Sequence, residues 1–143
     1  MARYSSSIES QLPPEAAFAY LADFANARFW DPSVGKARRS DSGELGVGST
    51  FELVARFGGR DVELTYGIDD FEPPRRVVLE ARRPSFVSRD TIRVEASGPG
   101  CRVRYDAVLS FRGPLSLLDP LLQRVFSRIG RRATRGLTAA LNP

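Results

Sequence analysis

Six short segments of alternating apolar and polar residues follow one another through the middle of the chain. They span residues 35–41, 49–57, 60–71, 76–83, 85–97 and 101–113. Alternation with a period of two is typical of half-buried β-strands, and turn residues such as Gly58 and Gly59 favour tight hairpins. Consecutive strands joined by tight turns predict an antiparallel meander. Such a sheet needs another element to cover its apolar face.

A long amphipathic segment follows these strands and is the only element large enough to provide that cover. After Pro114 the apolar residues recur with helical spacing, and arginines take the opposite face. We expect a helix of roughly 20–25 residues, with Pro120 tolerated in its first turn. The apolar stripe consists of Leu118, Leu122, Val125, Phe126, Ile129, Ala133, Leu137 and Ala140, and the basic stripe of Arg124, Arg128, Arg131 and Arg135.

The residues before the meander predict one strand and two helices. Residues 2–10 alternate as a strand, and helical spacing follows from Pro13 onward. Asp23 can cap a second, short helix, which should end near Trp30 because Pro32 disfavours helical geometry in the residue before it. The predicted order is one strand, two helices, six strands and one long helix, which is an α+β fold.

Composition excludes several classes of catalytic and structural site. The chain of 143 residues has no histidine and a single cysteine, Cys101. Histidine-based triads, cysteine–histidine pairs and the common zinc sites are therefore excluded, and so is an internal disulfide. We expect no metal and no cofactor. The length is typical of one domain, spanning residues 1–143.

Charge and hydropathy limit the partners of the chain. The formal net charge is +4, far from the dense basic patches of nucleic-acid-binding proteins, so no nucleic-acid partner is expected. The sequence starts without the apolar core of a signal peptide and contains no apolar run of about 20 residues. We expect a cytoplasmic protein without stable membrane insertion, as a monomer or homodimer. The arginine stripe is a solvated face or, alternatively, a face that leans on an anionic membrane surface.

Three segments resemble a known family in their residues and in their order. They are PPEAAFAYLADFANARFWDPSV (13–34), GVGSTFELVARFGGRDVELTYGIDDFEPPRRVVLEA (46–81) and DTIRVE with GCRVRYDAVLSF (90–95 and 100–111). Together they are similar to the polyketide cyclase/dehydrase and lipid-transport branch of the START-related, birch-pollen-allergen-like superfamily (SRPBCC). This resemblance covers nearly the whole chain. It implies the helix-grip fold, in which a curved antiparallel sheet of about seven strands wraps around a long C-terminal helix.

The single tryptophan, Trp30, lies where a helix is predicted to end and a loop to begin. In proteins of this superfamily the short helices and the following loop close the wide end of an internal cavity. The resemblance therefore places Trp30 and Phe29 at the rim of such a cavity. The alternative is that Trp30 seals a filled core, and the sequence leaves both interpretations open.

A ligand cavity requires apolar walls with few polar groups. The inward faces of the predicted strands and of the last helix supply such walls, although apolar faces of this kind are core by default. The predicted ligand-binding residues are Phe29, Trp30, Phe51, Leu53, Leu64, Tyr66, Ser88, Asp90, Tyr105, Leu122, Phe126 and Ile129.

Asp90 is the polar residue that fits its predicted surroundings least. It shares the inward face of its strand with Ser88 and Ile92, and burial of a lone carboxylate is costly. Asp90 can anchor a ligand hydroxyl or accept a proton, unless a bulge or a one-residue shift turns it toward water. Tyr66 and Tyr105 can present hydroxyls to a ligand or pack with those hydroxyls near the rim. These three residues are the catalytic candidates.

The predicted function is binding or transport of a hydrophobic small molecule, such as a lipid, a polyketide or an isoprenoid-like compound. The alternative is a cofactor-independent polyketide cyclase/aromatase or dehydratase, which needs a shaped pocket and a few acid–base groups. A third class, the partner-binding domain, needs a large exposed apolar patch. The outward positions of the strands are mostly polar and do not predict one.

Overall fold

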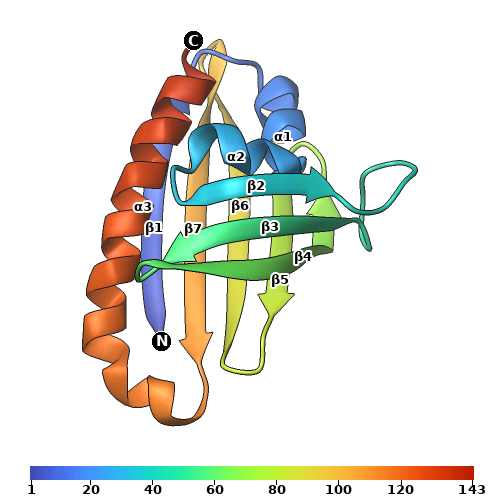
Figure 1. The fold of residues 1–143 in the computed structure, drawn as a ribbon. Coiled ribbons are helices and arrows are strands. Elements are labelled where there is room, and N and C mark those ends of the chain that lie inside the picture. The colour runs from blue at the N-terminus through green and yellow to red at the C-terminus, as the bar shows by residue number, and fades with distance from the viewer.

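Seven antiparallel strands form one sheet in the computed structural model, which describes residues 1–143 (Figure 1). The order across the sheet is β1-β7-β6-β5-β4-β3-β2, so each meander strand pairs with the next and the N-terminal strand joins beside the last. The predicted meander and α+β class are confirmed. The strands are β1 (Ala2–Ser10), β2 (Val34–Arg39), β3 (Thr50–Phe57), β4 (Arg60–Glu72), β5 (Arg76–Arg82), β6 (Phe86–Ser97) and β7 (Gly100–Phe111).

The helices also follow the predicted order, with two additional short 3-10 segments. The Asp23 side chain accepts a hydrogen bond from the backbone N–H of Ala25 and so caps the turn that leads to α2. Pro120 lies in the first turn of α3, where its missing N–H leaves no helical hydrogen bond unmade. The helices are α1 (Pro14–Ala22), η1 (Phe24–Asn26), α2 (Ala27–Trp30), η2 (Gly113–Leu118) and α3 (Asp119–Leu141).

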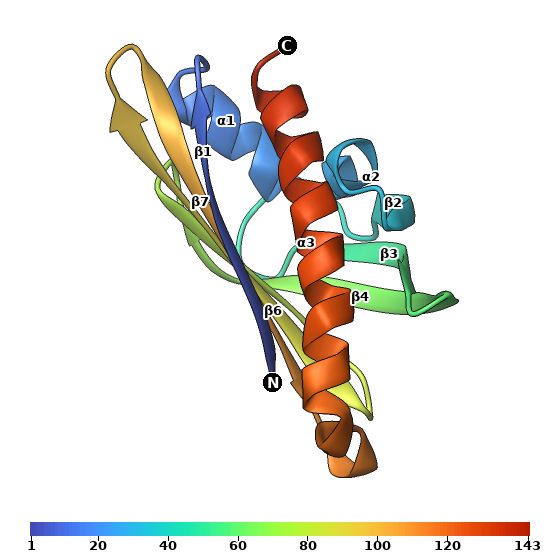
Figure 2. The ribbon, with the colours of Figure 1, turned by 90° about the vertical axis from the view of Figure 1, so that its left-hand side faces the viewer.

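The sheet is strongly curved, and α3 lies along its concave side. Strands β2, β3 and β4 run across the direction of β1, β6 and β7 (Figures 1 and 2). The register of β4 against β5 shifts between Ile68 and Asp70, and that of β2 against β3 shifts between Val34 and Lys36. Such irregularities bend a strand and increase its local twist. The curvature lets one sheet surround one helix, as in the helix-grip fold.

The C-terminal part of α3 packs tightly, whereas its N-terminal part does not. Gly130, Leu137 and Leu141 are buried, and the Ser10 hydroxyl donates a hydrogen bond to the carbonyl of Leu141 (2.6 Å). The apolar residues in the first half of the helix, such as Phe126, are only half-buried. The inward face of that half therefore does not meet the sheet directly.

Gly136 allows α3 to approach α2 closely. A Cβ atom at this position would lie 1.8 Å from the carbonyl oxygen of Trp30, which belongs to the backbone and cannot rotate away. We expect Gly136→Ala to lower the free energy of unfolding by about 2 kcal/mol or more, because overpacking outweighs the helix preference of alanine. The measurement is urea unfolding. Gly67→Ala is the control, since a Cβ there would meet nothing within 4 Å; equal losses for the two variants would contradict the prediction.

The predicted apolar stripe of the last helix is wrong at its first residue. Leu118 belongs to η2 and is 47% exposed, and Leu117 and Leu121 are exposed as well. The 3-10 segment has three residues per turn, so it breaks the phase of the stripe before α3 begins at Asp119. The inward face of the helix therefore starts at Leu122.

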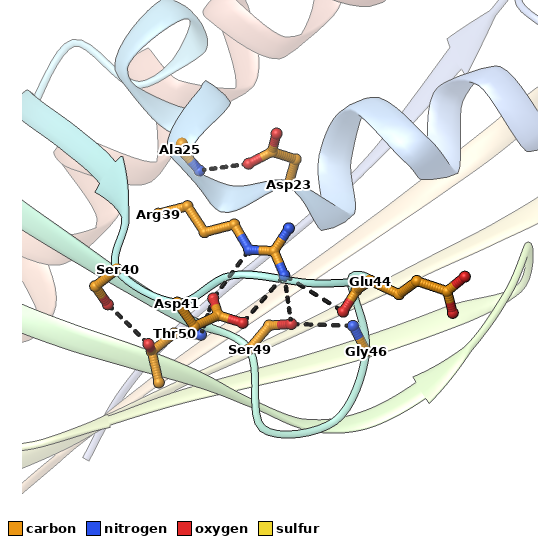
Figure 3. A network of polar contacts seen from close by, with 9 residues as sticks. All are labelled: Asp23, Ala25, Arg39, Ser40, Asp41, Glu44, Gly46, Ser49 and Thr50. Atoms are coloured by element: carbon orange, nitrogen blue, oxygen red, sulfur yellow. Dashed lines mark hydrogen bonds and ion pairs between the residues drawn. The ribbon is translucent and has the colours of Figure 1, made fainter.

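A network around Arg39 holds the long connection between β2 and β3 (Figure 3). The Arg39 guanidinium donates two hydrogen bonds to Asp41 (2.9 and 3.0 Å) and one to the carbonyl of Glu44 (3.3 Å). Asp41 also accepts from the backbone N–H of Thr50 (3.0 Å). The Arg39 hydrogen bonds, followed by the Thr50 bond, lower the pKa of Asp41 to about 2. This connection is thereby tied to the first residue of β3.

Candidate functional site

A cavity of about 410 Å³ lies between the concave face of the sheet and α3. Of the 32 residues that line it, 22 are hydrophobic. Most of them come from β1, β3, β4, β6 and β7 on one side and from α2 and α3 on the other. The half-buried first part of α3 forms a wall of this space. The volume falls within the range of small-molecule binding pockets.

Most of the predicted ligand-binding residues lie in the cavity wall. Ten of the twelve predicted residues, which come from six separate elements, lie together in this wall, as expected if the predicted faces of the strands and of the last helix point inward. The predicted residues that line the cavity are Trp30, Leu53, Leu64, Tyr66, Ser88, Asp90, Tyr105, Leu122, Phe126 and Ile129. The other two, Phe29 and Phe51, do not line it.

Phe29 points away from the cavity. Its side chain is 64% exposed, and the guanidinium of Arg28 lies 4.6 Å from the centre of its ring. The reason is geometric, because α2 is a single turn in which successive side chains point about 100° apart. Only one of the two neighbouring aromatic residues can face inward, and it is Trp30. The predicted place of Phe29 at a cavity rim is therefore wrong.

Phe51 belongs to the filled part of the core. It is fully buried, and its ring lies 6.5 Å from that of Phe24 in an edge-on arrangement. The η1 segment places Phe24 over this end of β3 and closes it. Leu53, two residues further along the same face, reaches the open space. The predicted face of β3 is correct, but the predicted cavity extends too far along it.

Trp30 both borders the cavity and packs in the core, which were the two alternatives for its position. Its indole lies edge-on to Tyr105 at 5.5 Å and to Phe24 at 6.1 Å, so it is part of an aromatic cluster. It also lines the cavity and is 3% exposed. A residue that is this deeply buried belongs to the inner wall of the cavity and not to its rim. The open end of the cavity is instead lined by half-buried residues, among them Phe86 and Leu115.

The wall therefore has two distinct ends. Lining residues that are less than a tenth exposed form what we call the buried end. Lining residues near the strand ends whose side chains reach solvent form what we call the exposed end. The buried end contains Trp30, Tyr66, Ser88, Asp90 and Tyr105. The exposed end contains Arg56, Phe57, Arg60, Phe86 and Leu115.

Asp90 points inward, as the alternation along β6 predicted. It is 6% exposed, and its Oδ2 accepts a hydrogen bond from the hydroxyl of Tyr105. Burial raises the pKa of Asp90 to about 7, the Tyr105 bond opposing this rise only in part. Burial, followed by the charge of Asp90, also raises the pKa of Tyr105 well above its ordinary value. Asp90 can therefore donate or accept a proton near neutral pH.

Two further polar groups accompany this pair. The hydroxyls of Tyr66 and Ser88 share a hydrogen bond of 2.8 Å. Asp31, directly after Trp30, accepts hydrogen bonds from the backbone N–H (2.9 Å) and the hydroxyl (2.8 Å) of Ser33. Burial is the main cause that raises the pKa of Asp31. The cavity thus contains two carboxyl groups whose pKa values are raised by burial.

Asp31 is the one acidic lining residue that is absent from the predicted site. Its position before Pro32 indicates the end of a helix, but a carboxylate beside the single tryptophan is also a signal for a polar group in a cavity wall. Small lining residues such as Ala107 and Ala133 were also missed. The sequence does not show whether an alanine on an apolar face lines a cavity or packs in the core.

Two further properties bear on the site. The structure brings no three histidine, cysteine, aspartate or glutamate side chains into a group that could hold a metal ion. No helix of the chain has both the length and the hydropathy to cross a membrane.

The fold is shared with solved structures from several bacteria. A START superfamily protein from Mycobacterium smegmatis is 12% identical, with a TM-score of 0.78 over 99% of this chain and 97% of its own. The Zhui aromatase/cyclase from Streptomyces sp. R1128 is 14% identical, with a TM-score of 0.74 over 97% and 92%. The Mll3558 protein from Rhizobium loti is 25% identical, with a TM-score of 0.67 over 98% and 96%.

Comparison of sequences assigns the family. No curated protein is significantly similar to this chain. A family model described as polyketide cyclase / dehydrase and lipid transport matches residues 1–142. The match covers the strand, the short helices, the meander and α3, which together enclose the cavity. The chain therefore belongs to the polyketide cyclase/dehydrase and lipid-transport family, with the helix-grip fold of START-related proteins.

Proposed function

We propose that the protein binds a hydrophobic small molecule, such as a lipid, a polyketide or an isoprenoid-like compound, in the cavity between the sheet and α3. The observation that carries the proposal is the cavity itself, about 410 Å³ in volume and mainly apolar. Unfilled apolar space of this size lowers stability, because its lining atoms lack packing partners. A bound apolar molecule would supply those partners and would be held by burial of its own surface.

A second candidate function is a cyclase/aromatase or dehydratase reaction on a polyketide-like molecule. The pairing of Asp90 with Tyr105 at the buried end favours it, because a carboxyl with a pKa near neutrality suits proton transfer. The fold shared with an aromatase/cyclase is consistent with this chemistry. The candidate uses the same cavity, so the question of binding comes first.

A large side chain that fills the cavity is expected to weaken ligand binding strongly without unfolding the protein. Ala133 lines the cavity from α3, and Ala133→Trp would place an indole in the space a ligand needs. We expect at least tenfold weaker binding of phenylnaphthylamine, a neutral apolar dye, measured by its fluorescence. Ala139→Trp is the matched control, since Ala139 is exposed on the same helix. Ala107→Phe, from β7 on the sheet side, repeats the test independently.

Equal dye binding by Ala133→Trp, Ala107→Phe and Ala139→Trp would contradict the proposal. Near-ultraviolet circular dichroism of each variant establishes that the native packing is retained. Native mass spectrometry of freshly purified protein, followed by organic extraction, would identify a molecule that co-purifies and would also give the oligomeric state. Incubation with a polyketide-like compound separates the two candidates: a carrier returns it unchanged, whereas a dehydratase returns it lighter by one water.

A further inference from the structure

The buried end of the cavity carries hydrogen-bonding groups but no positive charge. Its polar members are the indole, hydroxyl and carboxyl groups of Trp30, Tyr66, Ser88, Asp90 and Tyr105. The cationic side chains that line the cavity, Arg56 and Arg60, are exposed to solvent and belong to the exposed end as defined above. The polar groups of a ligand therefore meet different chemistry at the two ends.

Asp90 keeps one carboxyl oxygen free for a ligand. Oδ2 accepts the hydrogen bond from Tyr105, whereas Oδ1 has no hydrogen-bond partner within the protein. Because Oδ2 already accepts, the proton of the neutral carboxyl belongs on Oδ1, where it can be donated. Burial favours this neutral form up to a pKa of about 7. Tyr105 and Asp31 are the titratable groups that act on Asp90, and neither of them brings a positive charge.

Two more donors lie nearby without a full set of partners. The indole N–H of Trp30 is buried and makes no hydrogen bond. Tyr66 and Ser88 have two hydroxyl protons between them but share one hydrogen bond, so one proton remains available. The free proton of the Tyr66–Ser88 pair can be donated to an acceptor on a ligand, whereas the Trp30 N–H has almost no surface that faces the cavity.

An anionic group would be unfavourable at the same place. Asp31 and Asp90 would both oppose it when ionised, and no cation is present to compensate for the loss of water around it. A neutral carbonyl or hydroxyl oxygen can accept from these donors with no such penalty.

We propose that the cavity selects ligands that bring a neutral ketone, enol or phenol oxygen to the buried end beside Asp90, and that it rejects a carboxylate there. This inference rests on the proposed function, because it specifies the chemistry of a ligand in the same cavity. It separates two classes of hydrophobic molecule, since a fatty acid carries its polar group as a carboxylate and a ketone or phenol does not.

Three ligands with the same ring system test the inference: naphthalene, acetylnaphthalene and naphthoate. Quenching of the fluorescence of Trp30, the single tryptophan, reports binding at the buried end, and isothermal titration calorimetry gives the dissociation constants. At about pH 6, where Asp90 is protonated, we expect the ketone to bind about tenfold more tightly than the hydrocarbon. The carboxylate should bind at least about tenfold more weakly than the ketone, because its charge is disfavoured at the buried end.

Variants of the Asp90 pair assign the preference to these residues. The ratio of the hydrocarbon and ketone dissociation constants should fall several-fold in Asp90→Leu/Tyr105→Phe, which removes the free oxygen without leaving an unpaired hydroxyl. It should persist in Asp90→Asn, whose amide can still donate, and in the control Asp69→Asn on an exposed position of β4.

The outcomes separate the inference from the proposed function. Binding of naphthoate as tight as that of acetylnaphthalene, or equal binding of ketone and hydrocarbon, would overturn the inference and leave a binding cavity in place. A ketone preference that is undiminished in the Asp90→Leu/Tyr105→Phe protein would also overturn it. Failure of all three probes and of phenylnaphthylamine to bind would overturn the proposed function, and the inference with it.

Discussion

Replacement of Asp90 by asparagine is expected to stabilise the protein above neutral pH, by up to about 4 kcal/mol. Burial raises the pKa of Asp90 from 3.8 to about 7 in the folded protein, and each pKa unit corresponds to about 1.4 kcal/mol of stability. Asparagine keeps the shape of the neutral carboxyl, and its oxygen can accept the hydrogen bond from Tyr105. The variant removes the charge that the folded protein disfavours.

The sign of the pH dependence follows from the order of the two pKa values. Above about pH 4 the unfolded chain loses the Asp90 proton while the folded protein keeps it, so the folded protein binds more protons. The contribution of Asp90 to the free energy of unfolding therefore falls as the pH rises, until Asp90 ionises in the folded protein near pH 7. The stabilisation by Asp90→Asn should be close to zero near pH 4, grow through this window and level off above it.

Urea unfolding of both proteins across this pH range measures the difference directly. Asp69→Asn is the control, because Asp69 is half-exposed in an ion pair with Arg89 and such pairs contribute little to stability. Asp31, whose pKa is also raised, remains in every variant, so the comparison isolates Asp90. A constant difference between wild type and Asp90→Asn at all pH values would contradict the burial of an ionisable Asp90.

The fold could be predicted because its signals are local and repeated. Period-two alternation recurs in β3, β4, β6 and β7, and turn glycines separate β3 from β4 and β6 from β7, so each of these two pairs is predicted as a hairpin. The helical period of α3 then leaves one way to cover the sheet. The exception, Leu118, lies where a 3-10 segment changes the phase, and no spacing rule marks that change in advance.

The site could be predicted only in part, because a cavity is defined by what is missing between elements. Alternation identified the face that carries Asp90 and Tyr66, and both lie in the wall. It could not distinguish Phe51 from Leu53, which share a face and differ only in what lies opposite them. Phe29 and Trp30 posed the same problem across one helical turn. These distinctions depend on tertiary packing that no local pattern encodes.

Matched truncation of two phenylalanines should separate filled core from cavity wall. Phe51→Ala is expected to lower the free energy of unfolding by about 3–5 kcal/mol, because a fully buried ring would leave a new cavity in packed surroundings. Phe126→Ala should cost less than half as much, since Phe126 is half-buried and borders space that already exists. Urea unfolding of the two variants measures both losses, with the same atoms removed in each.

The effects on binding should run in the opposite order. Phe126 lies in the wall, so its truncation removes apolar surface that a ligand would contact and should weaken binding of phenylnaphthylamine several-fold. Phe51 touches Phe24 and does not reach the cavity, so folded Phe51→Ala should bind the dye with an affinity closer to that of wild type. Equal stability losses, or a larger binding defect in Phe51→Ala, would mean that the boundary between core and cavity lies elsewhere along β3. The opposed pattern would place that boundary between Phe51 and Leu53, because only one side of it contributes to binding.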